Sequence, residues 1–245
     1  MIVPAKTIIV IVVLGLLFAH GPVGEPSPLV QVRGTIELIN AQIKGRDGRV
    51  DASGVVVWLD PLEGGASRAG RSTRRVMTQR GKRFIPHVLA VETGAEIEFP
   101  NEDPFFHNVF SIYDGRRFDL GLYASGETRP VQFNRPGISY VFCNIHPQMS
   151  AVVIALETPY YTLSDGRGTF NIAGMPDGRY RLQFWHERAT AENLGKLSRT
   201  VQISGGNLDL GVIRISEEGY IPRQHANKHG EEYDPRRNRP AYRKP

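Results

Sequence analysis

The stretch of sequence that decides the fold is Cys143-Asn144-Ile145-His146-Pro147-Gln148-Met149, which directly follows the predicted strand 140–142. It places a thiol, an imidazole and a thioether within seven residues. A short loop at the end of a strand can turn all three side chains toward one ion. Two soft sulfur donors together with imidazole favour copper, with the thioether as a weak axial ligand. The loop supplies three ligands, so we expect a fourth from another part of the chain.

His107 is the candidate for the fourth ligand. It lies 36 residues upstream of Cys143, after a predicted strand that ends at Phe99. The sequence therefore predicts a metal site made of His107, Cys143, His146 and Met149. Taken singly, a lone cysteine or a methionine in a β-protein is usually core filler, so the prediction depends on their combination. Zinc is the main alternative for a set of cysteine and histidine ligands, but the thioether argues against it.

Cys143 is the single cysteine of the 245 residues. The N-terminus carries Lys6, an apolar run over 8–19 and then a polar, Pro-rich stretch, which is the layout of an export signal. The run is short for a membrane span of ~20 residues, but its cleavage site is poorly defined. We therefore predict that residues 1–27 are a signal peptide or an N-terminal membrane anchor, and that the chain is periplasmic or otherwise extracytoplasmic. A lone cysteine there is a free thiol, an intermolecular link or a metal ligand.

Alternation of apolar and polar residues with period two recurs along the chain, and no helix-period stripe of useful length follows the N-terminal run. Turn signals of the type Asp-Gly separate these segments. The pattern predicts a nearly all-β protein built as antiparallel sandwiches. The expected strands cover residues 32–38, 55–59, 88–99, 139–142, 151–156, 168–172, 180–185, 200–203 and 208–215.

Residues 77–156 resemble the cupredoxins, and within them the plastocyanin and amicyanin branch, some members of which are named for methylamine utilisation. The two-residue spacings of the ligand loop and the proline after its histidine are similar to the short amicyanin loop. The matching positions are Phe84, Pro86, Val91, Gly94, Ile97, Phe99, Asn101, Asp103, His107 and Asn108 in the first half, and Gly126, Glu127, Phe133, Pro136, Gly137, Tyr140, Phe142, Cys143, His146, Pro147 and Met149 in the second.

This resemblance implies a Greek-key sandwich that holds one blue copper ion. His107, Cys143 and His146 would be the strong in-plane ligands and Met149 the weak axial ligand. Asn108 would tie the two ligand segments together by hydrogen bonds. The resemblance also implies that His146 reaches the surface through an apolar patch, so we expect redox partner proteins to dock near His146.

Residues 162–182 resemble the second half of a carboxypeptidase-regulatory-like domain, which is a transthyretin-type β-sandwich. The first half of that pattern resembles Val32 to Ile36 together with Gly54 to Leu59. We therefore predict a split sandwich of residues 29–63 plus 158–216. A cupredoxin domain of residues 72–157 would be inserted in this sandwich or lie beside it, because the termini of compact domains often lie close together.

The chain has a net charge of +5, and its basic residues are concentrated at the C-terminal end, where Arg236, Arg237, Arg239, Arg243 and Lys244 have no acid among them. Residues 217–245 hold seven Lys or Arg against five acids, and we predict that they form a basic disordered tail. Such a tail would contact anionic lipid or an acidic partner, or would only confer solubility. Nothing in the chain resembles a recognition helix or an aromatic-laced basic strand, so nucleic acid is not an expected partner.

Five of the seven histidines lie outside the predicted site, and one of them, His20, belongs to the predicted signal or anchor. His87 and His186 are expected to be structural, because a lone histidine on a sheet rim is commonly just hydrogen-bonded. His225 and His229 lie in the predicted tail, where a metal would be held only loosely for want of a scaffold.

The sequence favours a protein that carries single electrons between redox partners. The alternative is a copper carrier or buffer without redox turnover. An enzyme is not expected, because copper oxidases and nitrite reductases need a second metal cluster, commonly wired by histidines that flank the cysteine. Here the flanking residues are Phe142 and Asn144, and the chain has only 7 histidines. An adhesion or glycan-binding sandwich would leave the four predicted ligands unexplained.

Overall fold

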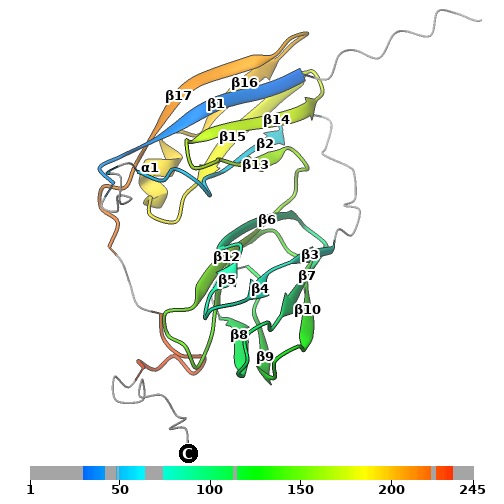
Figure 1. Ribbon diagram of the computed structural model, residues 1–245. Coiled ribbons are helices and arrows are strands. Elements are labelled where there is room, and N and C mark those ends of the chain that lie inside the picture. The colour runs from blue at the N-terminus through cyan, green and yellow to red at the C-terminus, as the bar shows by residue number, and fades with distance from the viewer. Residues whose placement is uncertain are drawn as a thin grey trace, which may run out of the picture.

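The computed structural model describes residues 30–41, 48, 50–63, 74–112, 115–221 and 225–233. The predicted signal or anchor, residues 1–27, lies outside this part of the chain. The regular structure of the described residues consists of strands and one short helix, α1 (Ala191–Gly195), which confirms the all-β prediction. None of the helices among them has the length and apolar character needed to cross a membrane. Figure 1 shows two stacked β units, the upper one with the strands of residues 30–61 and 161–216 and the lower one with the strands of residues 74–156.

The upper unit is a sandwich of two sheets. One sheet has the strand order β14-β1-β17 and the other β13-β2-β15-β16. Strand β1 alternates buried and exposed residues, as a strand with one face on a core must. Strands from both ends of the chain therefore share one core. The strands are β1 (Val30–Ile39), β2 (Val56–Pro61), β13 (Tyr161–Leu163), β14 (Thr169–Met175), β15 (Gly178–Trp185), β16 (Arg199–Ile203) and β17 (Leu208–Ser216).

The lower unit is a second sandwich. A five-stranded sheet, β6-β12-β11-β8-β9, faces the three-stranded sheet β10-β7-β3, and β4 pairs with β5 as a separate hairpin. Its core includes Phe99, Phe133, Cys143 and Met149, so both sulfur residues of the predicted site are core residues. The strands are β3 (Arg74–Val76), β4 (Thr78–Gln79), β5 (Phe84–Ile85), β6 (Val88–Glu92), β7 (Ala95–Pro100), β8 (His107–Ser111), β9 (Phe118–Tyr123), β10 (Thr128–Phe133), β11 (Gly137–Phe142) and β12 (Ser150–Leu156).

The expectation of purely antiparallel sandwiches is wrong at three strand pairs. Strand β1 runs parallel to β17, β6 parallel to β12, and β3 parallel to β7. Period-two alternation reports which face of a strand is buried but not the direction of its neighbour, so the sequence pattern does not distinguish the two arrangements.

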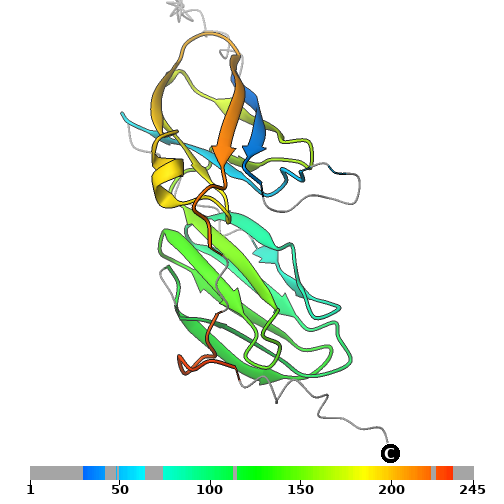
Figure 2. The same cartoon turned by 90° about the vertical axis from the view of Figure 1, so that its left-hand side faces the viewer.

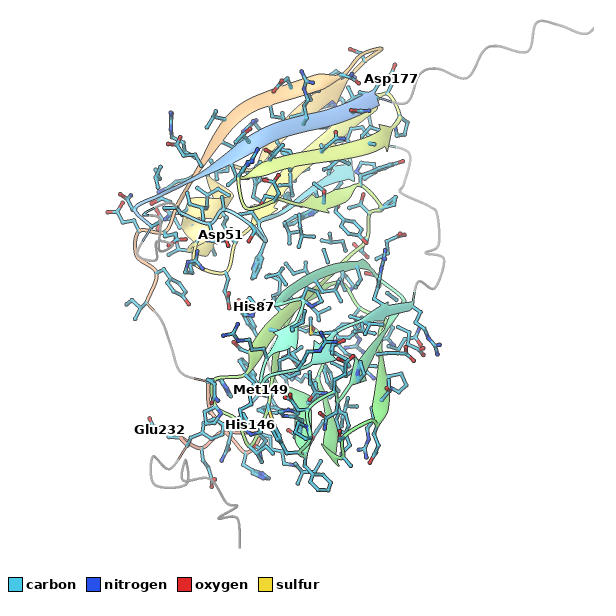
Figure 3. The ribbon with its side chains drawn as sticks, viewed as in Figure 1. Asp51, His87, His146, Met149, Asp177 and Glu232 are labelled. Carbon is cyan, nitrogen blue, oxygen red and sulfur yellow. The ribbon has the colours of Figure 1, made fainter. Side chains whose placement is uncertain are left out.

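A third apolar cluster joins the two sandwiches. Val56 and Trp185 of the upper unit pack there with Val152 and Ile154 of β12. Strand β12 is buried along nearly its whole length, because its alternate residues point into the lower core and into this junction. Across the same junction, His87 Nε2 lies 2.7 Å from a Glu187 carboxylate oxygen. Figure 3 shows His87 on the side of the lower unit that faces the upper one.

The described part of residues 217–245 differs from the expected disordered tail. Glu217 is fully buried and accepts hydrogen bonds from His186 Nε2 and Arg188 Nε, both at 2.9 Å. Residues 225–233 lie against the lower sandwich, where they are drawn in red in Figures 1 and 2. The basic composition pointed to a solvated segment, but these individual side chains find partners on the folded units. The remaining residues, 222–224 and 234–245, lie outside the described chain.

Candidate metal centre

The predicted ligands come from two chain segments at one end of the lower sandwich. His107 opens β8, and Cys143 directly follows β11. These two strands are antiparallel, and Phe110 of β8 pairs with Phe142 of β11. The start of β8 therefore lies beside the end of β11, which brings together two residues that are 36 positions apart.

Three of the four predicted ligands present their donor atoms to one another. Cys143 Sγ lies 3.6 Å from Nδ1 of His107 and 3.6 Å from Nδ1 of His146, and the two Nδ1 atoms lie 3.1 Å apart. A triangle with these sides has a circumradius of about 2.0 Å, which is the length of a metal–imidazole bond and close to that of a metal–thiolate bond. This is the one group of His, Cys, Asp or Glu donors within the described residues that is compact enough to hold an ion.

Asp103 orients the imidazole of His107. The Nε2 atom of His107 lies 2.8 Å from Asp103 Oδ2, and a carboxylate can only accept, so Nε2 carries the proton. The lone pair of Nδ1 therefore faces Cys143 and His146. Asp103 is itself held by backbone N–H groups of the turn between β4 and β5, from Gly81 at 2.6 Å and Lys82 at 2.9 Å. Such a partner behind a ligand fixes the tautomer and raises the basicity of the imidazole.

Burial sets the protonation states at the site. It lowers the pKa of His107 despite the opposing effect of Asp103. Burial, with the charge of nearby His107, lowers the pKa of His146 to about 4. Both imidazoles are neutral at pH 7, which is the form that binds metals. Burial also raises the pKa of the Cys143 thiol, against hydrogen bonds from backbone amides, so metal binding must release the proton of this thiol.

Met149 closes the loop that carries these ligands. Its carbonyl accepts a hydrogen bond from the Cys143 amide at 3.2 Å, and its own amide donates to the His146 carbonyl at 2.9 Å. Its side chain is 1% exposed and packs in the same core as Cys143. The role of Met149 as a ligand stays a prediction.

Asn108 joins the two ligand segments, as the resemblance implied. Its Oδ1 accepts a hydrogen bond from the Asn144 amide at 3.3 Å, and its Nδ2 donates to Asp119 Oδ1 at 2.7 Å. The side chain of Asn108, next to the ligand His107, therefore holds the backbone of Asn144, next to the ligand Cys143.

The surface beside His146 is apolar. The His107 side chain is fully buried and His146 is half-buried. Phe106 and Ile145, the chain neighbours of His107 and His146, are 51% and 44% exposed. The ring of Phe105 lies 5.5 Å from that of His146.

Several residues around the site have partners that the sequence does not predict. Asp103 was noted only as part of a family pattern, and its bond to His107 had no local signal beyond a spacing of four residues. The contacts of His225, Lys228 and Tyr233 with the ligand loop were missed altogether. His87 and His186 are hydrogen-bonded to Glu187 and Glu217, which agrees with their expected structural roles.

The solved structures that this chain resembles include cupredoxins. A purple cupredoxin from Nitrosopumilus maritimus matches 34% of this chain and 99% of its own, with 19% identity and a TM-score of 0.31. Amicyanin from Paracoccus versutus matches 41% of this chain and 97% of its own, with 18% identity and a TM-score of 0.30. A copper-containing nitrite reductase from Thermus scotoductus has 28% identity and a TM-score of 0.34, over 40% of this chain and 25% of its own.

No protein-family model matches the chain, and no curated protein does. All three TM-scores lie below 0.5. The proposed function therefore rests on the chemistry of the site itself.

Proposed function

We propose that the chain is an extracytoplasmic blue copper protein that transfers single electrons between redox partners. One copper ion would be held by His107, Cys143, His146 and Met149. The observation that carries the proposal is the triangle of one sulfur and two nitrogen atoms, with sides of 3.6, 3.6 and 3.1 Å. Its centre is one metal–ligand bond from each of the three donors.

The donor set fits copper better than zinc. A thiolate and two neutral imidazoles suit either metal, but a thioether in the same loop is a ligand that copper accepts and zinc rarely takes. When bound, copper would supply a centre that gains and loses one electron. The residues of the chain hold the donors in place around it. Asp103 fixes the His107 ring, and Asn108 fixes the start of the loop. A site held in this way changes its geometry little between oxidation states, which favours fast electron transfer.

The opening at His146 suits a transient partner. Phe106 and Ile145, next in the chain to two of the ligands, are exposed, and the ring of His146 is half-buried beside Phe105. A small apolar surface of this kind suits a redox encounter, which uses a small interface. Redox partner proteins would dock near His146, as the sequence analysis proposed. The extracytoplasmic location and a possible anchor over 8–19 rest on the N-terminal sequence pattern alone.

The two cores support the proposed domain organisation. One core combines residues 30–59 with residues 170–215, and the other uses only residues 77–155. We propose that the copper domain, 72–157, is inserted into the split sandwich of residues 29–63 plus 158–216. The carboxypeptidase-regulatory-like character of the split sandwich stays part of this proposal.

A copper carrier or buffer is the second candidate. The half-buried His146 favours it, because a ligand at the surface gives a copper donor or acceptor access to the ion. The buried positions of His107 and Cys143 favour retention of the ion instead, and for this reason we place the carrier second.

The test uses the chain without residues 1–27, loaded with copper. We expect an intense visible absorption band from the thiolate–copper bond, which Cys143→Ser and His107→Ala abolish. His87→Ala, at a half-exposed histidine of the junction between the two sandwiches, is the matched control and keeps the band. Fast self-exchange of electrons between oxidised and reduced protein would support the electron carrier. A colourless protein that still binds one ion would refute the electron-carrier function. Rapid release of copper to a chelator, without electron exchange, would favour the copper carrier instead.

A further inference from the structure

Residues 225–233, called the clasp from here on, return to the lower sandwich after β17 has completed the upper one. Figures 1 and 2 show this segment in red beside the lower unit, and Figure 3 shows Glu232 at the same end as His146 and Met149. The clasp is a compact turn. Asn227 Oδ1 accepts hydrogen bonds from the amides of His229 at 2.9 Å and Glu231 at 3.0 Å, and the Asn227 carbonyl accepts from Gly230 at 2.9 Å.

Three donors of the clasp reach the ligand loop, residues 143–149. The Tyr233 hydroxyl donates to the carbonyl oxygen of Cys143 at 3.2 Å. His225 Nε2 donates to the carbonyl oxygen of Pro147 at 2.6 Å. The Lys228 amide donates to Asn144 Oδ1 at 3.0 Å. The clasp therefore holds the loop on both sides of His146.

An aromatic stack covers the strand end that carries Cys143. The ring of His225 lies on that of Phe142, with centroids 4.0 Å apart and an interplanar angle of 20°. The ring of Tyr233 meets His225 edge-on at 5.2 Å. Phe142 is 7% exposed. The clasp thus shields the residue before the thiol from water.

A second route links the clasp to the loop through charged and amide groups. Lys228 Nζ donates to Asp119 Oδ2 at 2.8 Å, and the other oxygen of Asp119 accepts from Asn108 Nδ2 at 2.7 Å. Asn108 in turn holds the Asn144 amide. Burial alone would raise the pKa of Asp119, but Lys228 and the other donors hold it below its usual value, so the carboxylate is charged at neutral pH.

From these contacts we infer that the clasp is a working part of the metal centre, in which His225 and Tyr233 are positioning residues that keep the ligand loop closed around its ion. The carbonyl oxygens of Cys143 and Pro147 in the loop accept hydrogen bonds, and Tyr233 and His225 of the clasp donate them. Without the clasp, the loop would open more often and release its metal faster. The identity of that metal rests on the proposed function, but the closure of the loop does not depend on it.

The first test follows the loop in the full-length, metal-free protein. Hydrogen exchange measured by mass spectrometry reports on the amides of Cys143 and Met149, which are bonded within the loop. The double variant His225→Ala/Tyr233→Phe removes two hydrogen bonds and the aromatic stack, and we expect exchange in the loop to be roughly tenfold faster. Unchanged exchange would overturn the inference.

Tyr180→Phe is the matched control. Its hydroxyl also donates to a backbone carbonyl, that of Pro176 at 2.9 Å, but in the upper sandwich. This control should leave exchange in the ligand loop unchanged. An equal acceleration in both variants would show a general loss of stability and would also overturn the inference.

The second test measures release of copper from the loaded full-length chain to a chelator. We expect the double variant to release copper roughly tenfold faster than the unchanged chain, and the control variant to release it at the unchanged rate. Equal release rates in all three would overturn the clasp's role in metal retention. If the unchanged chain bound no copper, the proposed function would fail while the exchange experiment still decided whether the clasp holds the loop.

Discussion

Replacing Asp103 by asparagine is expected to raise the reduction potential of the copper-loaded chain. The carboxylate stands directly behind His107, with 2.8 Å between Asp103 Oδ2 and His107 Nε2. Burial alone would raise the pKa of Asp103, but the amides of Lys82 and Gly81 and the ring of His107 hold it below its usual value. The group is therefore an anion at neutral pH. A negative charge at this place stabilises the more positive, oxidised ion, so its removal favours the reduced ion.

The size of the shift follows from the distance. An ion bound to Nδ1 of His107 by a bond of ~2 Å would lie about 7 Å from the carboxylate, across the imidazole ring. With an effective dielectric constant of about 20, a unit charge at that distance contributes ~2 kcal/mol. For a one-electron couple this energy corresponds to ~100 mV. The Asp103 side chain is only 7% exposed, so solvent screens little of the effect.

Asparagine has nearly the shape of aspartate but only one acceptor oxygen. It cannot accept from Gly81, Lys82 and His107 together, so we also expect a loss of stability of roughly 1–3 kcal/mol from an unsatisfied buried donor. A spectroelectrochemical titration measures the potential, and the visible band shows whether the site is intact. Glu102→Gln is the matched control, since this neighbouring carboxylate is 41% exposed and should shift the potential far less. A shift for Asp103→Asn that is negative, or no larger than that of the control, would refute the reasoning.

Two further predictions concern the rest of the fold. Gly168 has a φ of +81° and a Cβ there would lie 2.1 Å from the Ile36 carbonyl oxygen, whereas Gly174, with a φ of +80°, faces open space. In denaturant unfolding, Gly168→Ala should lower the free energy of unfolding by roughly 3 kcal/mol or more, and Gly174→Ala by only about 1 kcal/mol. Equal losses would contradict the close packing of Gly168 on β1. The hydrogen bond that His87 Nε2 donates to Glu187 is the main cause that raises the pKa of His87. The stabilisation of the fold by this pair is therefore complete below the ordinary pKa of ~6.5 and is lost as the pH rises through the raised pKa. The His87 side chain is 47% exposed, so Glu187→Gln should cost less than about 1 kcal/mol at pH 5.5 and still less at pH 9; a cost that grows with pH would speak against the pair.

The donor triangle was predictable because its chemistry is compact in sequence. Cys143 and His146 share one short loop, and His107 follows a strand that the alternation reveals. The partner of His107 was not predictable in the same way. Asp103 depends on two amides of the turn between β4 and β5, and only the folded chain brings that turn to the site.

The strands were predictable where the alternation of apolar and polar residues is strong. The position of a segment was missed where contacts of single side chains determine it. The segment 151–156 was taken as an ordinary alternating strand, although all its residues are apolar. Continuous apolar sequence is typical of a strand that is buried on both faces, and β12 is indeed covered by the lower core on one face and by the other sandwich on the other. The clasp was missed because composition averages over a segment. Seven basic residues indicate solvation, while one stacked imidazole and one tyrosine hydroxyl decide where residues 225–233 lie.

The anchoring of Glu217 connects the upper sandwich with the metal centre. This carboxylate directly follows β17 and is held by His186 and Arg188, both of which come from the chain after β15. The start of the segment that leads to the clasp is thus fixed on the upper unit, while its end is fixed on the ligand loop through Tyr233. The apolar junction and the pair of His87 with Glu187 oppose sliding of one unit on the other. We therefore expect a partner that displaces the upper sandwich to change the rate of metal release, and to do so only while the clasp is intact.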